Sequence, residues 1–298
     1  MLKSLVLVTA VLGAMPAYAG DPKFEYGKAE EVAKVKGVEK TASAEGGIVF
    51  TTGNSETVTA TAGLKASRKK NDNKLAIEGS LTYAKAGVRV LNDQNGNGLI
   101  DNDSEIKTEK QVTAETYAGK LRYDRFLTQF NSLFAAGLIS RDKPAGKTLV
   151  LGAQLGYSRQ LYKSEKAEAV GEFGADYSNE NLTVGESLKI LSARAFVGYK
   201  AEMTEGTNFE TSGEILSNLN EEDLPTGKDG GAFQDTRFNF KASITSKIGK
   251  NLQFQTSIEF KYDHRPGPLA LKNLADGFVP EASSMDTIMK ASLIYSIF

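Results

Sequence analysis

A two-residue alternation between apolar and polar side chains is the feature that most constrains the fold of this chain. In residues 149–161 the odd positions are mostly large and apolar, including Leu151 and Leu155, whereas the even positions are small or polar. Residues 236–248 and 252–263 repeat the pattern. A period of two places successive side chains on opposite faces, which is the geometry of a β-strand and not of a helix. The chain is therefore predicted to consist largely of long strands with one apolar and one polar face.

Strands of this kind can be placed at twelve positions, and the connections between them alternate in length. The turn at residues 70–73 is tight, for example, whereas residues 91–107 and 218–234 form long connections. Tight turns on one side and long loops on the other are typical of outer-membrane barrels, in which the tight side is periplasmic. We predict an all-β fold, a transmembrane antiparallel up-and-down β-barrel of 12 strands with both termini periplasmic. The predicted strands are residues 41–52, 55–69, 73–88, 108–125, 129–142, 147–162, 167–180, 186–202, 206–218, 235–248, 251–264 and 286–298.

The N-terminus carries the features of a cleavable export signal. Lys3 supplies a positive charge, residues 5–15 are largely apolar, and Ala17 and Ala19 fit the small-x-small rule for cleavage before Gly20. The apolar stretch is shorter than the about 20 residues that a membrane-spanning helix needs. The chain is therefore predicted to comprise a cleaved signal peptide at residues 1–19, a periplasmic N-terminal segment at residues 20–40 and an outer-membrane barrel at residues 41–298.

The composition is compatible with a barrel even though the mean hydropathy is negative, at −0.31. In a barrel wall only every second residue meets lipid, so the average hydropathy stays low. A soluble sandwich that buries its apolar faces is the alternative, and the export signal, the strand lengths and the alternating connections argue against it. The 36 basic and 37 acidic residues nearly balance, so no nucleic-acid partner is expected. The chain has no cysteine and no tryptophan, which leaves the membrane interfaces to Tyr and Phe.

Several short motifs, in their order along the chain, resemble the salt-induced outer-membrane protein family, a domain family of unknown function in Gram-negative bacteria. The resemblance implies an outer-membrane barrel and a link to salt or osmotic stress. It implies no catalytic residues, so none are carried over. The chain departs from the family in an acidic insert after the third predicted strand and in an extra residue before Phe298. The motifs are residues 52–57 (TGNSET), 121–128 (LRYDRFLT), 134–137 (FAAG), 151–157 (LGAQLGY), 262–266 (YDHRP) and 293–296 (LIYS).

The acidic insert has the spacing of the first nine positions of a calcium-binding loop. Gly98 occupies the position of the sharp turn, and Ile100 takes the apolar position. Ser104 stands where the pattern requires Glu, and strands rather than helices flank the loop. An ordinary solvated Asn/Gly/Asp-rich loop is the equally weighted alternative. The calcium ligands in the first interpretation are Asp93, Asn95, Asn97, the carbonyl of Leu99 and Asp101.

His264 is the only histidine and therefore the only candidate for imidazole-based nucleophilic catalysis. No serine occupies a neighbouring position on the same face, and Pro266 follows almost at once. Ser283 and Ser284 lie on the last long connection, and nothing in the sequence places them beside the imidazole. We therefore expect a histidine in a rim or loop position, with no catalytic and no cofactor-binding residues.

The polar parity of the strands gives a set of charged residues that are predicted to line the lumen. One interpretation is a water-filled channel in which charged rings set a weak ion preference. The other is a lumen closed by paired charges, which the narrow interior of a 12-strand barrel favours. The principal predicted lining residues are Lys65, Glu78, Lys120, Arg122, Glu172, Asp176, Glu214, Arg237, Lys241, Glu259 and Lys261.

The sequence thus predicts a non-enzymatic barrel in the bacterial outer membrane, linked to salt or envelope stress or to passive passage of small solutes or ions. The alternatives are a surface-exposed calcium-binding or adhesive barrel and, less favoured, a barrel-embedded hydrolase. The expected partners are outer-membrane lipid, lipopolysaccharide and, through the C-terminal strand, the barrel-assembly machinery. In that strand Met289, Leu293, Tyr295 and Ile297 share the apolar parity, whereas Phe298 falls on the other face.

Overall fold

The computed structural model describes residues 38–51, 57–91, 106–143, 145–223, 229–268, 279 and 281–297. These residues form a closed antiparallel barrel, so the predicted all-β fold and its 12 wall strands are confirmed. Within the described ranges, no helix is long and apolar enough to cross a membrane. The wall strands are β1 (Glu39–Thr51), β2 (Thr57–Lys70), β3 (Asn73–Leu91), β4 (Ile106–Phe126), β5 (Asn131–Asp142), β6 (Lys147–Lys163), β7 (Ala167–Leu182), β8 (Leu188–Thr204), β9 (Thr207–Asn218), β12 (Thr236–Lys247), β13 (Leu252–Asp263) and β14 (Met285–Ser296).

Each wall strand pairs with its neighbour in sequence, and β1 pairs with β14 to close the ring. The exception is β9, which pairs directly with β12 because β10 (Glu222–Asp223) and β11 (Asp229–Gly230) form a separate two-stranded sheet. This small sheet lies in a segment that was predicted only as a long connection. The Asn218 side chain holds its base together, since its Nδ2 donates to the carbonyls of Asn220 and Gly231 at 2.8 and 3.0 Å.

The strand limits agree with the predicted ones to within three residues. The sequence of β5 is ambiguous in phase because Leu133 and Phe134 are adjacent and both large. The structure resolves this by turning Leu133 outward, where 49% of it is exposed, and Phe134 inward, where 4% is exposed. The two connection types also differ as predicted. The connections after β2, β4, β6, β8 and β12 have two to four residues, and we call their end of the barrel the turn side. We call the opposite end the loop side, and among its connections between wall strands only the four-residue one between β5 and β6 is as short.

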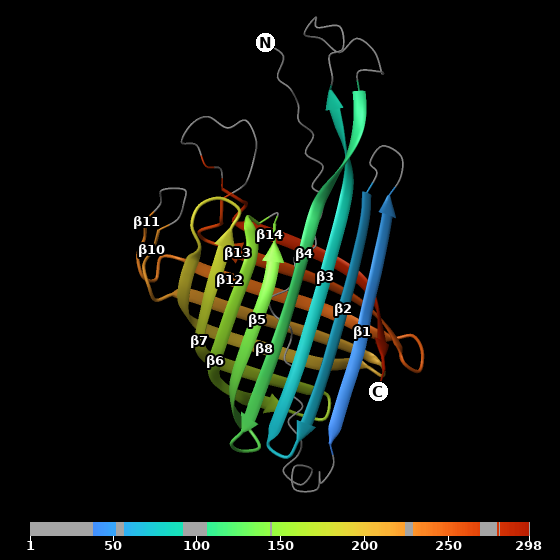
Figure 1. Ribbon diagram of the computed structural model, residues 1–298. Coiled ribbons are helices and arrows are strands. Elements are labelled where there is room, and N and C mark those ends of the chain that lie inside the picture. Colours follow the sequence, from blue (N-terminus) through green and yellow to red (C-terminus); the bar gives the residue numbers. More distant parts are fainter. Residues whose placement is uncertain are drawn as a thin grey trace, which may run out of the picture.

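The barrel wall separates an apolar outer face from a polar inner face. Large apolar side chains such as Leu155 and Phe173 point outward and are 64% and 68% exposed. The buried side chains of the interior are mostly polar or charged, and only small clusters of apolar side chains lie among them. On the loop side, β3 and β4 continue beyond the rim as a paired ribbon (Figure 1). The charged interior is therefore the place where a functional site can be sought.

Candidate functional site

The strand alternation turns all eleven predicted lining residues toward the interior of the barrel. The structure distributes many of them over three groups of ion pairs. Arg122, Glu172 and Glu214 share one group, Arg237 belongs to a second group near the loop-side rim, and Lys241 and Glu259 pair in a third. Each group has its own set of partners.

The middle of the interior is crossed by a chain of ion pairs, which we call the central belt: Arg122, Glu172, Arg194 and Glu214. Arg122 Nη2 lies 2.8 Å from Glu172 Oε1, and Arg194 Nη1 lies 2.7 Å from Glu172 Oε2. Arg194 Nε then donates to Glu214 Oε1 at 2.6 Å. The belt joins β4 to β7, β8 and β9, and at most 5% of any of its side chains is exposed. Such a buried network stabilises the barrel only while every member keeps its partner.

An aromatic ring supports the two arginines of the belt. The guanidinium carbon of Arg122 lies 4.1 Å from the ring centroid of Phe134, and that of Arg194 lies 5.7 Å from it. The ring fits because β6 carries Gly156 at this level. A Cβ added to Gly156 would lie 2.7 Å from two ring carbons of Phe134. The glycine therefore makes room for the ring on which the guanidinium groups stack.

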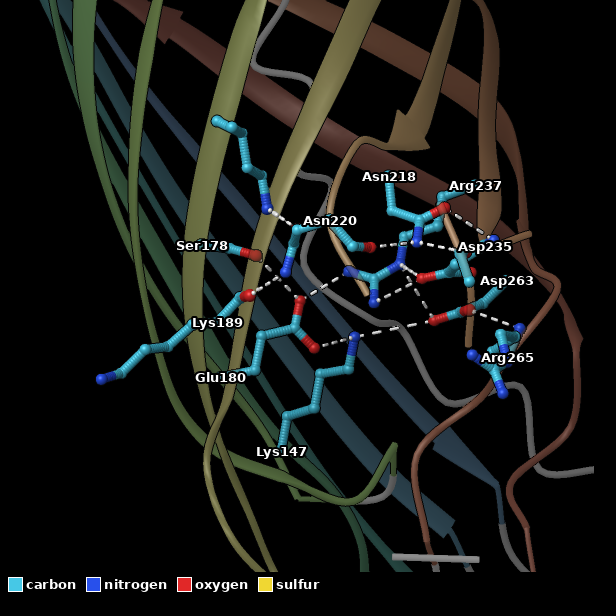
Figure 2. A network of polar contacts seen from close by, with 12 residues as sticks. Lys147, Ser178, Glu180, Lys189, Asn218, Asn220, Asp235, Arg237, Asp263 and Arg265 are labelled. Atoms are coloured by element: carbon cyan, nitrogen blue, oxygen red, sulfur yellow. Dashed lines mark hydrogen bonds and ion pairs between the residues drawn. The ribbon is translucent and has the colours of Figure 1, made fainter. Parts of the chain in front are cut away.

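Toward the loop side, a second network connects opposite parts of the wall. We call Lys147, Glu180, Arg237 and Asp263 the loop-side network, and Figure 2 shows these side chains converging on one another. Glu180 of β7 pairs with Arg237 of β12 at 2.5 Å and with Lys147 of β6 at 2.8 Å. Lys147 also lies 3.7 Å from Asp263 of β13, and Arg237 lies 3.6 Å from it. The network therefore spans the lumen, because β6 and β13 are five places apart in the ring of strands.

The loop that carries β10 and β11 adds a further carboxylate to this network. Asp235, immediately before β12, lies 3.1 Å from Arg237 Nη2. Its backbone N–H donates to Asn218 Oδ1 at 2.8 Å, which fixes the loop beneath Arg237 (Figure 2). Burial raises the pKa of the Asp235 carboxyl, and the positive charge of Arg237 opposes that rise.

Above the loop-side network, the described ends of the connection between β13 and β14 lie over the mouth of the barrel. We call its described ends, His264–Pro268 and Glu281–Ser284, the strap. The two ends pair with each other, since the Ala282 N–H donates to the Gly267 carbonyl at 2.9 Å and Pro268 forms a bridge with Glu281. Pro268 is among the fully buried side chains of the molecule.

The strap reaches the wall opposite its own strands. Gly146, in the turn between β5 and β6, has a φ of 75°, and a Cβ added there would lie 2.2 Å from the Pro268 carbonyl oxygen. Thr183, in the loop after β7, donates to the same oxygen at 3.4 Å. In the ring of strands β5 is six places from β13. The strap therefore lies across the mouth, and Gly146 is needed for its close approach.

A charged cavity of about 220 Å³ lies in the interior and is lined in part by Lys241 and Glu259. Five lysines and four glutamates contribute to its wall. Lys65, Glu78 and Lys120 occupy facing positions on β2, β3 and β4, so their side chains alternate in charge across the sheet. Glu259 lies between Lys241 at 3.5 Å and Lys290 at 3.6 Å. These are looser ion pairs than those of the central belt.

A second cavity, of about 140 Å³, lies under the strap. Asp176 and Lys261 both line it, as do members of the loop-side network. Asp176 accepts a hydrogen bond from Gln154 Nε2 at 2.9 Å. Leu138 is shared by the linings of both cavities, whereas Arg122 and Arg194 of the central belt belong to neither lining. The packed belt thus lies beside these two solvent-sized spaces.

Sequence reasoning missed several members of these networks, most notably Arg194, Lys147 and Glu180. Arg194 was missed because its strand is apolar on both faces, with Ile190 and Phe196 pointing inward beside it. Glu180 and Lys147 stand at strand ends, where the alternation gives little guidance. Glu180 has the same parity as Glu172 and Asp176, and that signal could have found it.

The histidine has a local role in the described part of the chain. His264 Nδ1 and the hydroxyl of Tyr262 are 3.0 Å apart. Ser283 Oγ of the strap instead donates to the carbonyl of Met285, the first residue of β14, at 2.9 Å. Neither contact assembles a nucleophile with a base.

Other predictions fall outside the described residues. These are the signal peptide, nearly all of the N-terminal segment, the calcium ligands Asp93 to Asp101 and the terminal Phe298. In the part of the chain that is described, no three His, Asp or Glu side chains are grouped so as to hold a metal ion.

Comparison with known proteins gives one informative match. The chain has no significant match among curated proteins. It is similar to a NanC porin structure at 9% identity, covering 87% of this chain and 100% of that chain with a TM-score of 0.45. It is also similar to OmpT of Vibrio cholerae (12% identity, 87% and 99% covered, TM-score 0.39) and to the anion-selective porin from Comamonas acidovorans (9%, 88% and 99%, 0.37). Since residues 44–297 match the family described as "Protein of unknown function, DUF481", the chain belongs to that family.

Proposed function

We propose that this chain is a non-enzymatic barrel of the bacterial outer membrane whose lumen passes small ions and hydrophilic solutes when the strap leaves the opposite wall. The observation that carries the proposal is the contact of the strap with Gly146 across a charged interior. A mouth that is covered by a segment from one wall, above paired charges from both walls, supports regulated rather than constant passage. The polar inner face supplies water and ions with hydrogen-bonding partners throughout.

The membrane location rests on the reversal of polarity across the wall. Leu151 faces outward and is 46% exposed, whereas Gln154 faces inward and is 5% exposed. An arginine on the lipid face near the bilayer midplane costs about 2–4 kcal/mol. Leu151→Arg should therefore reduce the amount of folded barrel in outer-membrane fractions far more than Gln154→Arg does. Equal accumulation of the two variants would contradict the assignment of the outer face to lipid.

The strap can be displaced by a single methyl group. In Gly146→Ala the new Cβ would overlap the Pro268 carbonyl oxygen, so the strap must move away from this wall. The backbone strain of a positive φ, about 1–2 kcal/mol, accompanies this substitution. Gly206→Ala is the matched control, because Gly206 has a similar φ of 78° but lies in a turn-side hairpin.

Conductance in planar bilayers tests the proposal directly. We expect rare or small conductance steps from the wild-type protein and from Gly206→Ala, and several-fold larger steps from Gly146→Ala. Indistinguishable traces from the three proteins would refute a closing role of the strap. Absence of conductance in all three would refute passage through the lumen altogether.

The link to salt that the family resemblance implies has a physical candidate in the loop-side network. The Lys147–Asp263 pair is 3.7 Å long, and its side chains are 16% and 23% exposed, so solvent ions can reach it. Salt screens exposed pairs over a Debye length of about 8 Å at physiological ionic strength. We infer that rising salt weakens this contact beneath the strap. Conductance should then rise more steeply than salt concentration in the wild type and in simple proportion to it in Lys147→Met.

Calcium binding by the acidic insert is a separate proposal that rests on the spacing of Asp93, Asn95, Asn97 and Asp101 in the sequence. Isothermal titration of the purified barrel with millimolar calcium tests it. Binding heat that disappears in Asp93→Asn/Asp101→Asn would support a surface calcium site, and no heat in the wild type would end the proposal.

A further inference from the structure

A group of charged side chains lies on the outer face of the barrel close to the loop-side rim. Lys85 is on β3, Arg141 is on β5, and Lys143 follows the end of β5. Glu115 of β4 lies between the last two, 3.7 Å from Arg141 and 3.3 Å from Lys143. We call Lys85, Glu115, Arg141 and Lys143 the rim cluster. It has three positive charges and one negative charge and stands outside the lumen.

The side chains next to the rim cluster fix its depth in a membrane. Toward the middle of the wall, the outward positions on β3 and β5 are Leu81 and Ile139, which are 47% and 51% exposed. Tyr83 and Tyr117 follow, and each is 37% exposed. Outward-facing aromatic residues mark the boundary between hydrocarbon and headgroups in outer-membrane barrels. Tyr117 faces Arg141 and Tyr83 faces Glu115 in the strand register, so the rim cluster begins at that boundary.

The two tyrosines hold the cations in place without neutralising them. Arg141 Nη1 donates to the Tyr117 hydroxyl at 2.6 Å, and its guanidinium carbon lies 5.5 Å from the centroid of that ring. The Lys85 ammonium lies 5.5 Å from the ring centroid of Tyr83. Arg141 Nε is shielded from solvent and has no acceptor among the described residues. An acceptor supplied by a bound anion would satisfy this donor.

We propose that the rim cluster binds a phosphate of a phosphorylated glycolipid, the lipopolysaccharide headgroup of the outer leaflet. The planar guanidinium of Arg141 can donate two hydrogen bonds to a phosphate, and the lysines add point charges around it. Glu115 lies between Arg141 and Lys143 and leaves the cluster with a net charge of two. The site is on the outside of the barrel and is independent of passage through the lumen. It rests on the proposed membrane location, with the loop side at the cell surface.

Comparison with the opposite rim shows why the ligand carries phosphate monoesters, each with up to two negative charges, and is not an ordinary phospholipid, whose phosphodiester has one. On the turn side, Arg125 lies beside Tyr123 in a similar arrangement of tyrosine and arginine. There Arg125 donates to Asn73 Oδ1 at 3.0 Å and lies 3.9 Å from Asp72, so a carboxylate already offsets its charge. The rim cluster retains two positive charges, and charge complementarity favours a ligand with at least two phosphate charges.

Binding of lipid probes to the purified full-length barrel in a neutral detergent tests the proposal, with native mass spectrometry as the readout. The probes are bis-phosphorylated lipid A, lipid A without phosphates, and phosphatidylglycerol. We expect the wild type to bind the bis-phosphorylated probe about tenfold more tightly than either of the others. Arg141→Gln/Lys143→Gln should lose this preference, while the turn-side control Arg125→Gln should keep it.

Three outcomes would overturn the proposal: equal binding of phosphorylated and dephosphorylated lipid A, equal or tighter binding of phosphatidylglycerol, or a preference that survives in the double variant. Lys85→Gln provides a second variant if the double one fails to fold, and a reduced preference is expected from it too. The measurement uses no bilayer and no ion current. A failure of lumen passage therefore leaves its result unchanged, and membrane location is tested separately by fractionation.

Discussion

Two parts of the barrel interior each hold a buried carboxylate between two cations, but with different geometry. In the central belt, Glu172 forms ion pairs with Arg122 and Arg194 at 2.8 and 2.7 Å, and the arginine side chains are at most 4% exposed. In the wall of the 220 Å³ cavity, Glu259 lies between Lys241 and Lys290 at 3.5 and 3.6 Å, and the lysine side chains are 20% and 19% exposed.

The difference shows how the barrel combines a packed network of ion pairs with a hydrated cavity. Arginine keeps its charge when buried and bonds through several fixed donors, so it suits a packed belt. Lysine is a flexible, strongly hydrated point charge, so it suits the edge of a cavity. The belt therefore determines the shape of the wall, whereas the lysines of the cavity determine the charge that a solute meets. Substitutions in the belt should mainly lower stability, whereas substitutions of the cavity lysines should mainly change ion preference.

The largest effect is expected from Glu172→Gln, because it leaves two buried guanidinium groups without their shared carboxylate. Breaking a buried ion pair costs about 3–5 kcal/mol in free energy of unfolding. Glu259→Gln should cost about 1 kcal/mol, since its lysines can turn toward water. The measurement is the midpoint of thermal unfolding in detergent. Unfolding is monitored as the change in electrophoretic mobility of the barrel on heating. Similar midpoints for the two variants would remove the distinction between belt and cavity.

A smaller loss of stability is expected from Gly156→Val, which tests whether the belt depends on its aromatic support. The added side chain would collide with the ring of Phe134 and force it away from Arg122. Overpacking of this kind costs about 1–3 kcal/mol. Gly137→Val on β5 is the control, because a Cβ there has nothing within 4 Å. The same unfolding assay applies, and equal destabilisation by both variants would show that only backbone preference matters.

The smallest effect is expected from Lys241→Gln/Lys290→Gln, which removes charge from the cavity and leaves the belt intact. The unfolding midpoint should hardly change. In the Gly146→Ala background, the reversal potential in a salt gradient should shift by a few millivolts toward cation preference, because the glutamates of the cavity remain. A shift toward anions would mean that these lysines do not face the path of the ions.

Much of the fold could be predicted because the evidence for it is local. The alternation in residues 149–161 fixed β6 and its two faces, and the tight connection at residues 70–73 fixed the hairpin of β2 and β3. The small sheet of β10 and β11 was not predicted, because it depends on hydrogen bonds from Asn218 to residues further along the loop. The charged lining could be listed from parity, but Arg194 was hidden among inward-facing apolar neighbours.

The amino-acid sequence by itself determined that the chain forms long two-faced strands and which charged residues share the inner face. Both follow from the two-residue period of a strand, a property of each segment alone. Only the tertiary structure decided that Glu172 joins two arginines, that Lys147 meets Asp263 across the lumen, and that the strap rests on Gly146. These contacts join residues from distant strands, and they exist only once strand register and ring closure have set how far apart the opposite walls lie.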